Sequence, residues 1–145
     1  MEHSVTKLFV MCGIPASGKT TLSRQLAKQY NMKLYCYDEL PKANTYLKDE
    51  VHAKMFYNIA EDLRNGYSVV VDDLHTKLKW RNGILSAVGD IPCKKTLIVM
   101  KTPLEECLVR NTHRQRRLPD FVITNLYQSY EPPSLAEGWD EIITI

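Results

Sequence analysis

The segment from Val10 to Leu22 places two glycines, a lysine and a threonine at a spacing suited to holding a phosphate. Gly13, Gly18, Lys19 and Thr20 fit the pattern G-x-x-x-x-G-K-[ST]. In this pattern, backbone N–H groups form an anion nest at a helix N-terminus. An apolar run before the segment and a helical run after it favour this interpretation over a chance match in an ordinary turn. We therefore predict that a nucleoside triphosphate is bound by Gly13, Ile14, Pro15, Ala16, Ser17, Gly18, Lys19, Thr20 and Thr21.

Acidic residues follow two of the predicted strands. Asp38 follows the second strand, and Asp72 and Asp73 follow the third. Ligands of parallel sheets bind at the carboxyl ends of the strands, where phosphoryl transfer needs a carboxylate base and oxygen ligands for a metal. We expect Asp38 to be the base, Asp72 to hold Mg²⁺ together with Thr20 or to contact the acceptor, and Asp73 to contact the acceptor. Helix capping or exposure to solvent is the alternative for each of these carboxylates.

Four arginines lie between positions 110 and 117, in a stretch without an acidic residue. Guanidinium groups can neutralise the charge that builds on a transferred phosphate. We expect this segment to form a lid over the nucleotide, with Arg114 as the catalytic arginine and Arg110 as a second nucleotide ligand. Arg110 and Arg114 would share one face if the helix continued that far. A solvated basic helix end is the alternative.

A second group of basic and aromatic residues follows the acidic pair. Lys77, Lys79, Trp80 and Arg81 could grip the phosphates of an acceptor or stack a base. We assign Arg81 to the acceptor site, whereas Trp80 is equally consistent with packing. His75, beside the acidic pair, could contact the acceptor, but we expect it to be a surface residue.

Strand-like and helix-like runs alternate along the chain. The apolar runs predict strands, and the helical spacing of apolar residues predicts helices between them. This order favours an α/β fold, a three-layer sandwich around a parallel five-stranded sheet. The expected strands are residues 6–12, 33–37, 67–73, 95–100 and 140–145, and the expected helices are 19–30, 49–65, 78–88, 103–112 and 119–130.

The composition is that of one globular domain spanning residues 1–145, with the lid around 110–118. The net charge of +2 is too small to indicate nucleic-acid binding by itself, and the four cysteines form no C-x-x-C pair. Cys12 and Cys36 are predicted to be buried thiols. The sequence contains neither a signal peptide nor an apolar stretch long enough to span a membrane, so we expect a cytoplasmic protein that binds no membrane. It predicts no particular oligomeric state.

Absent motifs narrow the class of nucleotide-binding protein. A guanine-specific GTPase would carry an N-K-x-D base reader, which the sequence lacks. A motor ATPase would need a larger domain. A small phosphotransferase fits the length best.

Several segments together resemble a family of P-loop kinases. The segments are "GIPASGKTTLSRQLA", "YCYDEL", "VVVDDLHTKLKWR", "RNTHRQRRLPDFVI" and "YEPPSLAEGWDEIITI". They are similar to phage-type polynucleotide kinases, the kinase domain of DNA-end repair kinases and seryl-tRNA kinases, in the zeta-toxin/AAA_33-like ATPase group. The resemblance implies the fold of nucleoside-monophosphate kinases, ATP and Mg²⁺ as cofactors, a catalytic aspartate at Asp38 and a lid arginine at Arg114.

The same resemblance implies transfer of the γ-phosphate of ATP to a hydroxyl, often the 5′-OH end of DNA or RNA. Two positions depart from the phage-type pattern. Pro41 and Lys42 stand where an arginine usually follows the catalytic aspartate, and Asp72-Asp73-Leu74 replaces an Asp-Thr-Asn-like run. Another acceptor, such as seryl-tRNA, a modified nucleobase or a small metabolite, is therefore an alternative. A nucleotide-binding module without phosphotransfer is a third possibility.

Overall fold

The computed structural model describes residues 5–37 and 48–145. Within them, five strands form one parallel sheet in the order β2-β3-β1-β4-β5. The predicted parallel five-stranded sheet is therefore confirmed. The strands are β1 (Lys7–Cys12), β2 (Lys33–Cys36), β3 (Val69–Asp72), β4 (Lys94–Val99) and β5 (Glu141–Thr144).

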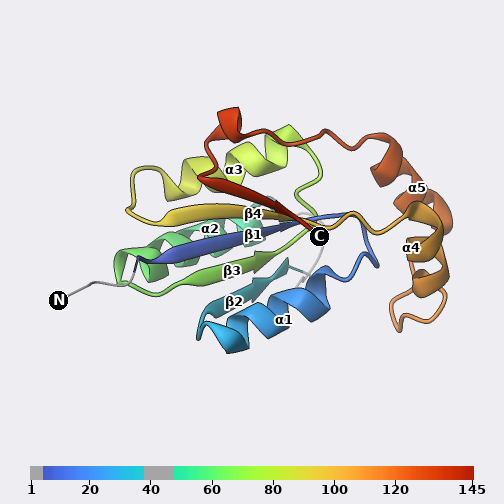
Figure 1. Ribbon diagram of the computed structural model, residues 1–145, viewed down its shortest axis with the longest axis horizontal. Helices are drawn as coiled ribbons and strands as arrows, with labels where there is room; N and C mark the ends of the chain where they lie inside the picture. Colours follow the sequence, from blue (N-terminus) through green and yellow to red (C-terminus); the bar gives the residue numbers. More distant parts are fainter. Residues whose placement is uncertain (1–4, 38–47) are drawn as a thin grey trace.

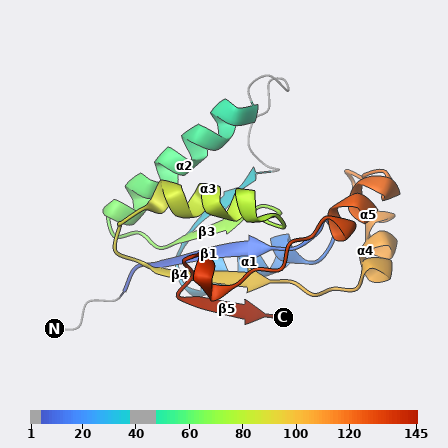
Figure 2. The same ribbon diagram turned by 90° about the horizontal axis from the view of Figure 1, so that it is seen from above.

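Helices cover both faces of the sheet, as the prediction of a three-layer sandwich requires. Figures 1 and 2 show α1 on one face, α2 and α3 on the other, and α4 and α5 beyond the carboxyl ends of β1 and β4. The helices are α1 (Lys19–Gln29), α2 (Lys48–Arg64), α3 (Leu78–Val88), α4 (Leu104–Asn111) and α5 (Asp120–Gln128), with a short 3₁₀ helix η3 (Leu135–Glu137) before β5.

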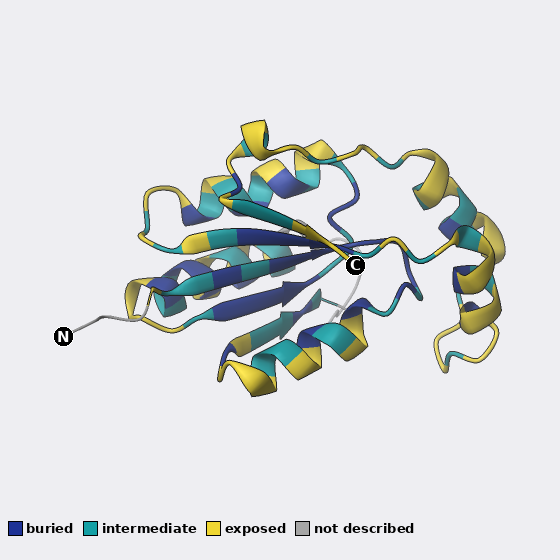
Figure 3. Ribbon diagram, viewed as in Figure 1, coloured by how far each residue is buried: buried dark blue, intermediate teal, exposed yellow. Residues whose placement is uncertain are grey.

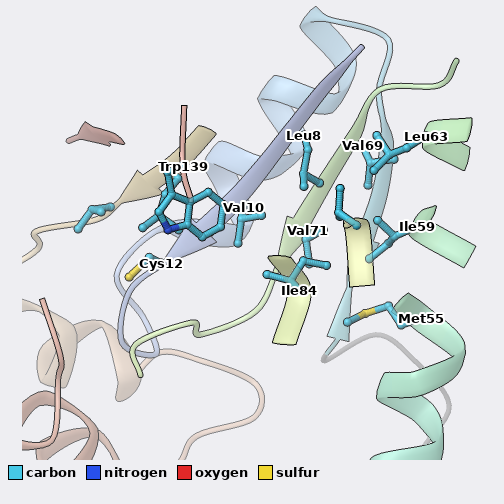
Figure 4. Close-up of a cluster of buried hydrophobic side chains, with 13 residues drawn as sticks. Leu8, Val10, Cys12, Met55, Ile59, Leu63, Val69, Val71, Ile84 and Trp139 are labelled. Atoms are coloured by element: carbon cyan, nitrogen blue, oxygen red, sulfur yellow. The ribbon is translucent and has the colours of Figure 1, made fainter. Parts of the chain in front are cut away.

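The main core lies between the sheet and the helices α2 and α3. On α2, Met55, Ile59 and Leu63 recur at a spacing of four residues and are all buried. They pack with alternate residues of β1, such as Leu8 and Val10, and with neighbouring strands (Figure 4). Burying each large aliphatic side chain contributes about 1.5–3 kcal/mol, so this cluster fixes α2 and α3 on the sheet.

Burial along the strands follows from the covering of both faces. All four residues of β3 are buried, and the carboxyl-terminal parts of β1 and β4 are buried as well (Figure 3). The edge strand β5 has no buried residue: its first two residues are half-buried and its last two are exposed. The loops that follow Cys12 and Asp72 therefore begin at the ends of two well-buried central strands, β1 and β3, which fix their positions.

The cysteines behave as buried thiols rather than as a metal or disulfide site. Cys12, Cys36 and Cys107 are buried and Cys93 is half-buried, and all four are free. Burial raises the pKa of Cys12 to about 11, so its thiol stays protonated at neutral pH. This confirms the predicted burial of Cys12 and Cys36.

The segment expected to form a lid, around residues 110–118, is only partly helical. Helix α4 ends at Asn111, so Arg114 does not lie on it. The buried Asn111 side chain donates to the carbonyl of Leu118 at 2.7 Å and accepts from the N–H of Leu118 at 3.1 Å. These two hydrogen bonds close residues 112–117 into a loop that presents Arg114 beside α4. Among the described residues, no helix is long and apolar enough to cross a membrane.

Candidate active site

The loop between β1 and α1 has the backbone geometry of an anion cradle. Gly18 takes a left-handed conformation (φ 100°) at the N-cap of α1, where its side chain supplies no capping group. Ala16 is also left-handed (φ 66°). The first N–H groups of α1 have neither a side-chain cap nor an acidic residue in the first turn. An anion is the natural partner for such a helix N-terminus.

Close packing explains the first glycine of the pattern. A Cβ at Gly13 would lie 2.7 Å from Oγ of Ser17 and 3.1 Å from Cβ of Met100, so a side chain there would displace the loop. The Thr102 hydroxyl donates to the Ser17 carbonyl at 2.7 Å and braces the loop from β4. Ser17 Oγ itself is buried without a hydrogen-bond partner among the described residues. A buried hydroxyl in this state fits a loop built to take a bound phosphate.

Lys19 and Thr20 begin α1 at the base of this cradle. Lys19 is buried, and its Nζ donates to the carbonyl of Ile14 at 3.0 Å. The Thr20 hydroxyl donates to Oδ2 of Asp72 at 2.8 Å. Hydroxyl and carboxylate oxygens are the ligands that Mg²⁺ takes from proteins, so this pair fits a magnesium site beside the phosphates.

The structure separates the two neighbouring aspartates. Asp72 ends β3, is buried, and also accepts from the Ser23 hydroxyl at 3.2 Å. Asp73 turns toward α2, where its Oδ2 lies 3.3 Å from Nε2 of His52. Asp72 therefore faces the nucleotide loop, whereas Asp73 faces the helix on the other side of the sheet.

Local hydrogen bonds set the charge of Asp73. Burial alone would raise its pKa, but hydrogen bonds from His52 and from the backbone N–H of Leu74, which lies 2.8 Å from Oδ1, outweigh it. The pKa of Asp73 is therefore below its ordinary value, and the group is a carboxylate at neutral pH.

Two of the predicted arginines line the same cleft as the cradle: Arg110 lies on α4, and Arg114 lies in the loop after it. Arg110 pairs with Glu106 at 2.6 Å, and its Nη1 lies 3.4 Å from the position of a Cβ at Gly18. Arg114 Nη1 is buried, and within the described chain it has no hydrogen-bond partner. An unsatisfied guanidinium N–H beside a phosphate loop is suited to an anion, because burying it otherwise costs free energy.

These residues line one cleft of about 1460 Å³. One part of its lining comes from the cradle, the loop after β4 and the arginines, and includes Arg110, Arg114 and Thr102. The other part comes from the ends of β2 and β3, from α2 and from α3, and includes Tyr37, His52, Phe56, Asp73, Lys79 and Trp80. Asp38, the expected base, lies outside the described residues, although it directly follows Tyr37 in sequence.

Arg81 does not reach the cleft, contrary to its assignment to the acceptor. Its side chain is fully buried, and it donates from Nε and Nη2 to the two carboxylate oxygens of Glu137 at 2.9 and 3.1 Å. Its Nη1 donates to the carbonyl of His75 at 3.0 Å. Arg81 therefore joins α3 to η3, and we withdraw it from the acceptor site.

His75 is also placed differently from the expectation of a surface residue. It is buried, and its Nδ1 lies 3.0 Å from the carbonyl oxygen of Met11. Burial lowers the pKa of His75 despite the nearby charge of Asp73, so the ring is neutral. The left-handed backbone of His75 (φ 47°) gives it this inward direction.

Sequence reasoning did not assign several residues of the cleft, among them His52, Phe56 and Thr102. His52 and Phe56 lie on a helix whose apolar stripe was visible, but their contacts depend on how α2 sits over the end of β3. Thr102 follows β4 outside the phosphate-binding pattern. A polar residue in the loop after a buried strand is a signal that could have pointed to Thr102, which lies three positions beyond the end of β4.

Most of the chain matches a known protein family. A family described as an AAA domain matches residues 8–133. The L-seryl-tRNA(Sec) kinase of Methanococcus maripaludis is 26% identical over 142 residues, which cover 92% of this chain and 56% of that protein. The chain thus spans little more than half the length of this curated relative.

Solved kinase structures share the fold. A fungal RNA kinase superposes with a TM-score of 0.75 at 18% identity, covering 100% of this chain and 76% of that one. A gluconokinase from Sinorhizobium meliloti superposes with a TM-score of 0.70 at 17% identity, covering 99% of this chain and 83% of that one. Because the family match extends over most of the chain, this protein belongs to the AAA_33 family of P-loop kinase domains.

Proposed function

We propose that the protein is an ATP- and Mg²⁺-dependent kinase that transfers the γ-phosphate to a nucleic-acid hydroxyl, the 5′-OH end of DNA or RNA. The observation that carries this proposal is the single cleft in which the phosphate cradle and an acceptor wall with Asp73, Lys79 and four aromatic or imidazole rings meet.

The donor side is assigned from the contacts of the cradle. The N–H groups of Gly18, Lys19 and Thr20 bind the phosphates, with the Lys19 side chain at the β- and γ-phosphates. Thr20 and Asp72 hold Mg²⁺, which when bound neutralises phosphate charge. Arg114, whose Nη1 is buried without a partner among the described residues, stabilises the charge of the transferring phosphoryl group, and Arg110 supports it.

The acceptor side carries the proton transfer. The acceptor hydroxyl oxygen forms a bond to the γ-phosphorus while the bond to the bridging oxygen of ADP breaks. The proton of the hydroxyl passes to the carboxylate of Asp38, which follows β2 in the sequence. Asp73, ionised and held by His52, orients the acceptor. Positioning and electrostatics supply most of the rate.

Two features support a nucleic acid as the acceptor. The acceptor part of the cleft combines rings with an exposed lysine, Lys79, which suits a base next to a phosphate. The names of the seryl-tRNA kinase and the RNA kinase described above also place nucleic acids among the acceptors of similar proteins.

Transfer of label from radiolabelled ATP tests the proposal. The wild-type protein is incubated with a 5′-OH oligonucleotide, the same oligonucleotide with a 5′-phosphate, seryl-tRNA and a sugar acid. We expect labelling of the 5′-OH end alone, and its loss in Asp38→Asn. Labelling of the sugar acid but of no nucleic acid would refute the nucleic-acid acceptor, and full activity of Asp38→Asn would refute the assigned base.

A second acceptor class is favoured by one sequence feature and one structural likeness. Pro41 and Lys42 replace the arginine of phage-type kinases, and a gluconokinase shares the fold. Seryl-tRNA, a modified nucleobase or a small metabolite would then receive the phosphate with the same donor machinery. The acceptor panel separates these cases directly. A nucleotide-binding module without transfer would bind ATP but release no ADP in response to any acceptor.

A further inference from the structure

Four planar side chains line the acceptor part of the cleft. Tyr37 follows β2, His52 and Phe56 lie one turn apart on α2, and Trp80 lies on α3. The rings of Tyr37 and His52 are stacked, with centroids 4.2 Å apart and planes inclined by 3°. The ring centroids of His52 and Phe56 are 6.0 Å apart, and their planes are inclined by 39°. Residues from three elements thus bring their rings to one surface.

Neighbouring groups hold these rings in place. Asp73 lies 3.3 Å from Nε2 of His52 and fixes the imidazole. Phe56 packs close to α3, since a Cβ at Gly83 would lie 3.6 Å from its ring. Nζ of Lys77 lies 5.5 Å from the centroid of the Trp80 ring, a cation–π distance. The rings are therefore ordered before any ligand binds, which lowers the entropic cost of binding one.

The four rings are partly accessible, although Phe56 also packs against the main core. Tyr37, His52, Phe56 and Trp80 are all half-buried, whereas the aliphatic core beneath α2 is fully buried. The wall presents planar rings, of which Tyr37, His52 and Trp80 also carry O–H or N–H groups. A nucleobase matches it, because stacking on aromatic side chains is tolerant of sequence and needs no hydrogen-bond readout.

We propose that Tyr37, His52, Phe56 and Trp80 form a stacking wall for the terminal nucleobase of a single-stranded 5′-OH end. Lys79, exposed at the same edge of the cleft, contacts the first phosphate after that nucleoside. This inference rests on the proposed kinase function and specifies how its acceptor is recognised. The enzyme would select an end by the presence of a base rather than by its identity.

The test compares two oligonucleotides that differ only in the terminal base. One carries a normal 5′-OH nucleotide, and the other carries an abasic 5′-OH sugar with the same phosphates. We expect wild-type kcat/KM to be about 5- to 150-fold higher for the base-bearing end, the range that stacking of one base supplies. Trp80→Leu should reduce this ratio toward one while the KM for ATP stays unchanged.

Two further variants make the result specific. Phe56→Leu nearly conserves the volume that packs against the core and should also lower the ratio. Tyr57→Leu removes the neighbouring ring on α2, which is 64% exposed and does not line the cleft, and should leave the ratio as in the wild type. Thermal melts of each variant verify that it is folded.

The outcomes separate the wall from the kinase function. Equal phosphorylation of both ends by the wild type would overturn the wall and leave the kinase function standing. A raised KM for ATP in Trp80→Leu, with the ratio of the two ends unchanged, would assign the rings to adenine and also overturn the wall. Phosphorylation of neither oligonucleotide would overturn the proposed acceptor, and the wall with it.

Discussion

Lys19 is the lysine of the phosphate-binding pattern, and the structure places it where that pattern predicts. Lys19 is the first residue of α1 and directly follows the N-cap residue Gly18. Its side chain is buried beside the cradle, and its Nζ donates to the carbonyl of Ile14. A lysine ammonium beside an anion cradle attracts phosphate oxygens, so the position favours binding of a polyanion.

Lys19→Met tests this role at the scale of one side chain. Methionine keeps most of the volume and removes the charge, so we expect kcat/KM to fall by about 10²- to 10³-fold, as for loss of one preorganised donor. Lys28→Met, in the last turn of the same helix, is the matched control and should retain activity. Steady-state kinetics with varied ATP measure both. Wild-type activity in Lys19→Met would contradict the assigned donor site.

His75 predicts how stability depends on pH. Its pKa is lowered in the folded protein from 6.5, so the unfolded chain binds more protons as the pH falls through that value. The contribution of neutral His75 to folding is therefore complete above about pH 6.5 and is lost progressively below it.

His75→Asn should make the free energy of unfolding less dependent on pH between about pH 7 and pH 5. Asparagine tolerates the left-handed backbone of this position and offers an amide donor to Met11. Urea unfolding at several pH values measures the slope. An unchanged slope in the variant would show that other groups control acid stability in this range.

At the scale of elements, the buried pair of Arg81 and Glu137 joins α3 to η3. Glu137 also accepts from the indole N–H of Trp139 at 3.0 Å, so one carboxylate links the helix, the 3₁₀ turn and a core residue. Burial would raise the pKa of Glu137, but the hydrogen bonds from Arg81 and Trp139 lower it below the ordinary value. The carboxylate thereby stays ionised and paired at neutral pH.

Glu137→Ala should lower the free energy of unfolding by about 3–5 kcal/mol, because it leaves the fully buried Arg81 charge without its partner. Glu105→Ala, at an exposed position in the first turn of α4, should change it by less than about 1 kcal/mol. Chemical denaturation gives both values. Similar small losses in the two variants would argue against the pair as a structural link.

The lid loop makes a separate prediction about transfer. Arg114→Ala should lower kcat by about 10²-fold or more, since it removes a guanidinium that lines the cleft with a buried Nη1 lacking a partner among the described residues. Arg117→Ala is the control, because Arg117 is exposed and lies 4.0 Å from Asp120. Single-turnover transfer of labelled phosphate measures the step. Equal effects of the two substitutions would remove Arg114 from the active site.

At the scale of the whole molecule, most of the fold followed from local patterns. Apolar runs bounded by glycine, and helical stripes such as Met55, Ile59 and Leu63, placed the strands and helices to within about two residues at most ends. The phosphate-binding pattern fixed the cradle because its chemistry is local. The order of the strands needed the structure, since it depends on contacts between distant segments.

Tertiary contacts also explain where sequence reasoning failed. Arg81 looked like a cleft residue because it follows Asp72 and Asp73, but its partner Glu137 lies 56 positions later. His75 looked exposed because it is polar and lies in a loop, yet a left-handed backbone turns it inward. The sequence pointed to Trp80 as a possible stacking residue but not to Tyr37, His52 and Phe56, whose rings come together only once α2 packs on the sheet.

Acceptor-dependent release of ADP tests the central claim most directly. The protein is held at saturating Mg²⁺ and ATP, and the rate of ADP formation is measured with a 5′-OH oligonucleotide and with the same strand carrying a 5′-phosphate. The account predicts that the free hydroxyl stimulates ADP release in one-to-one proportion with the ends phosphorylated, while the blocked end gives only the background rate. Identical rates with the two strands would contradict it.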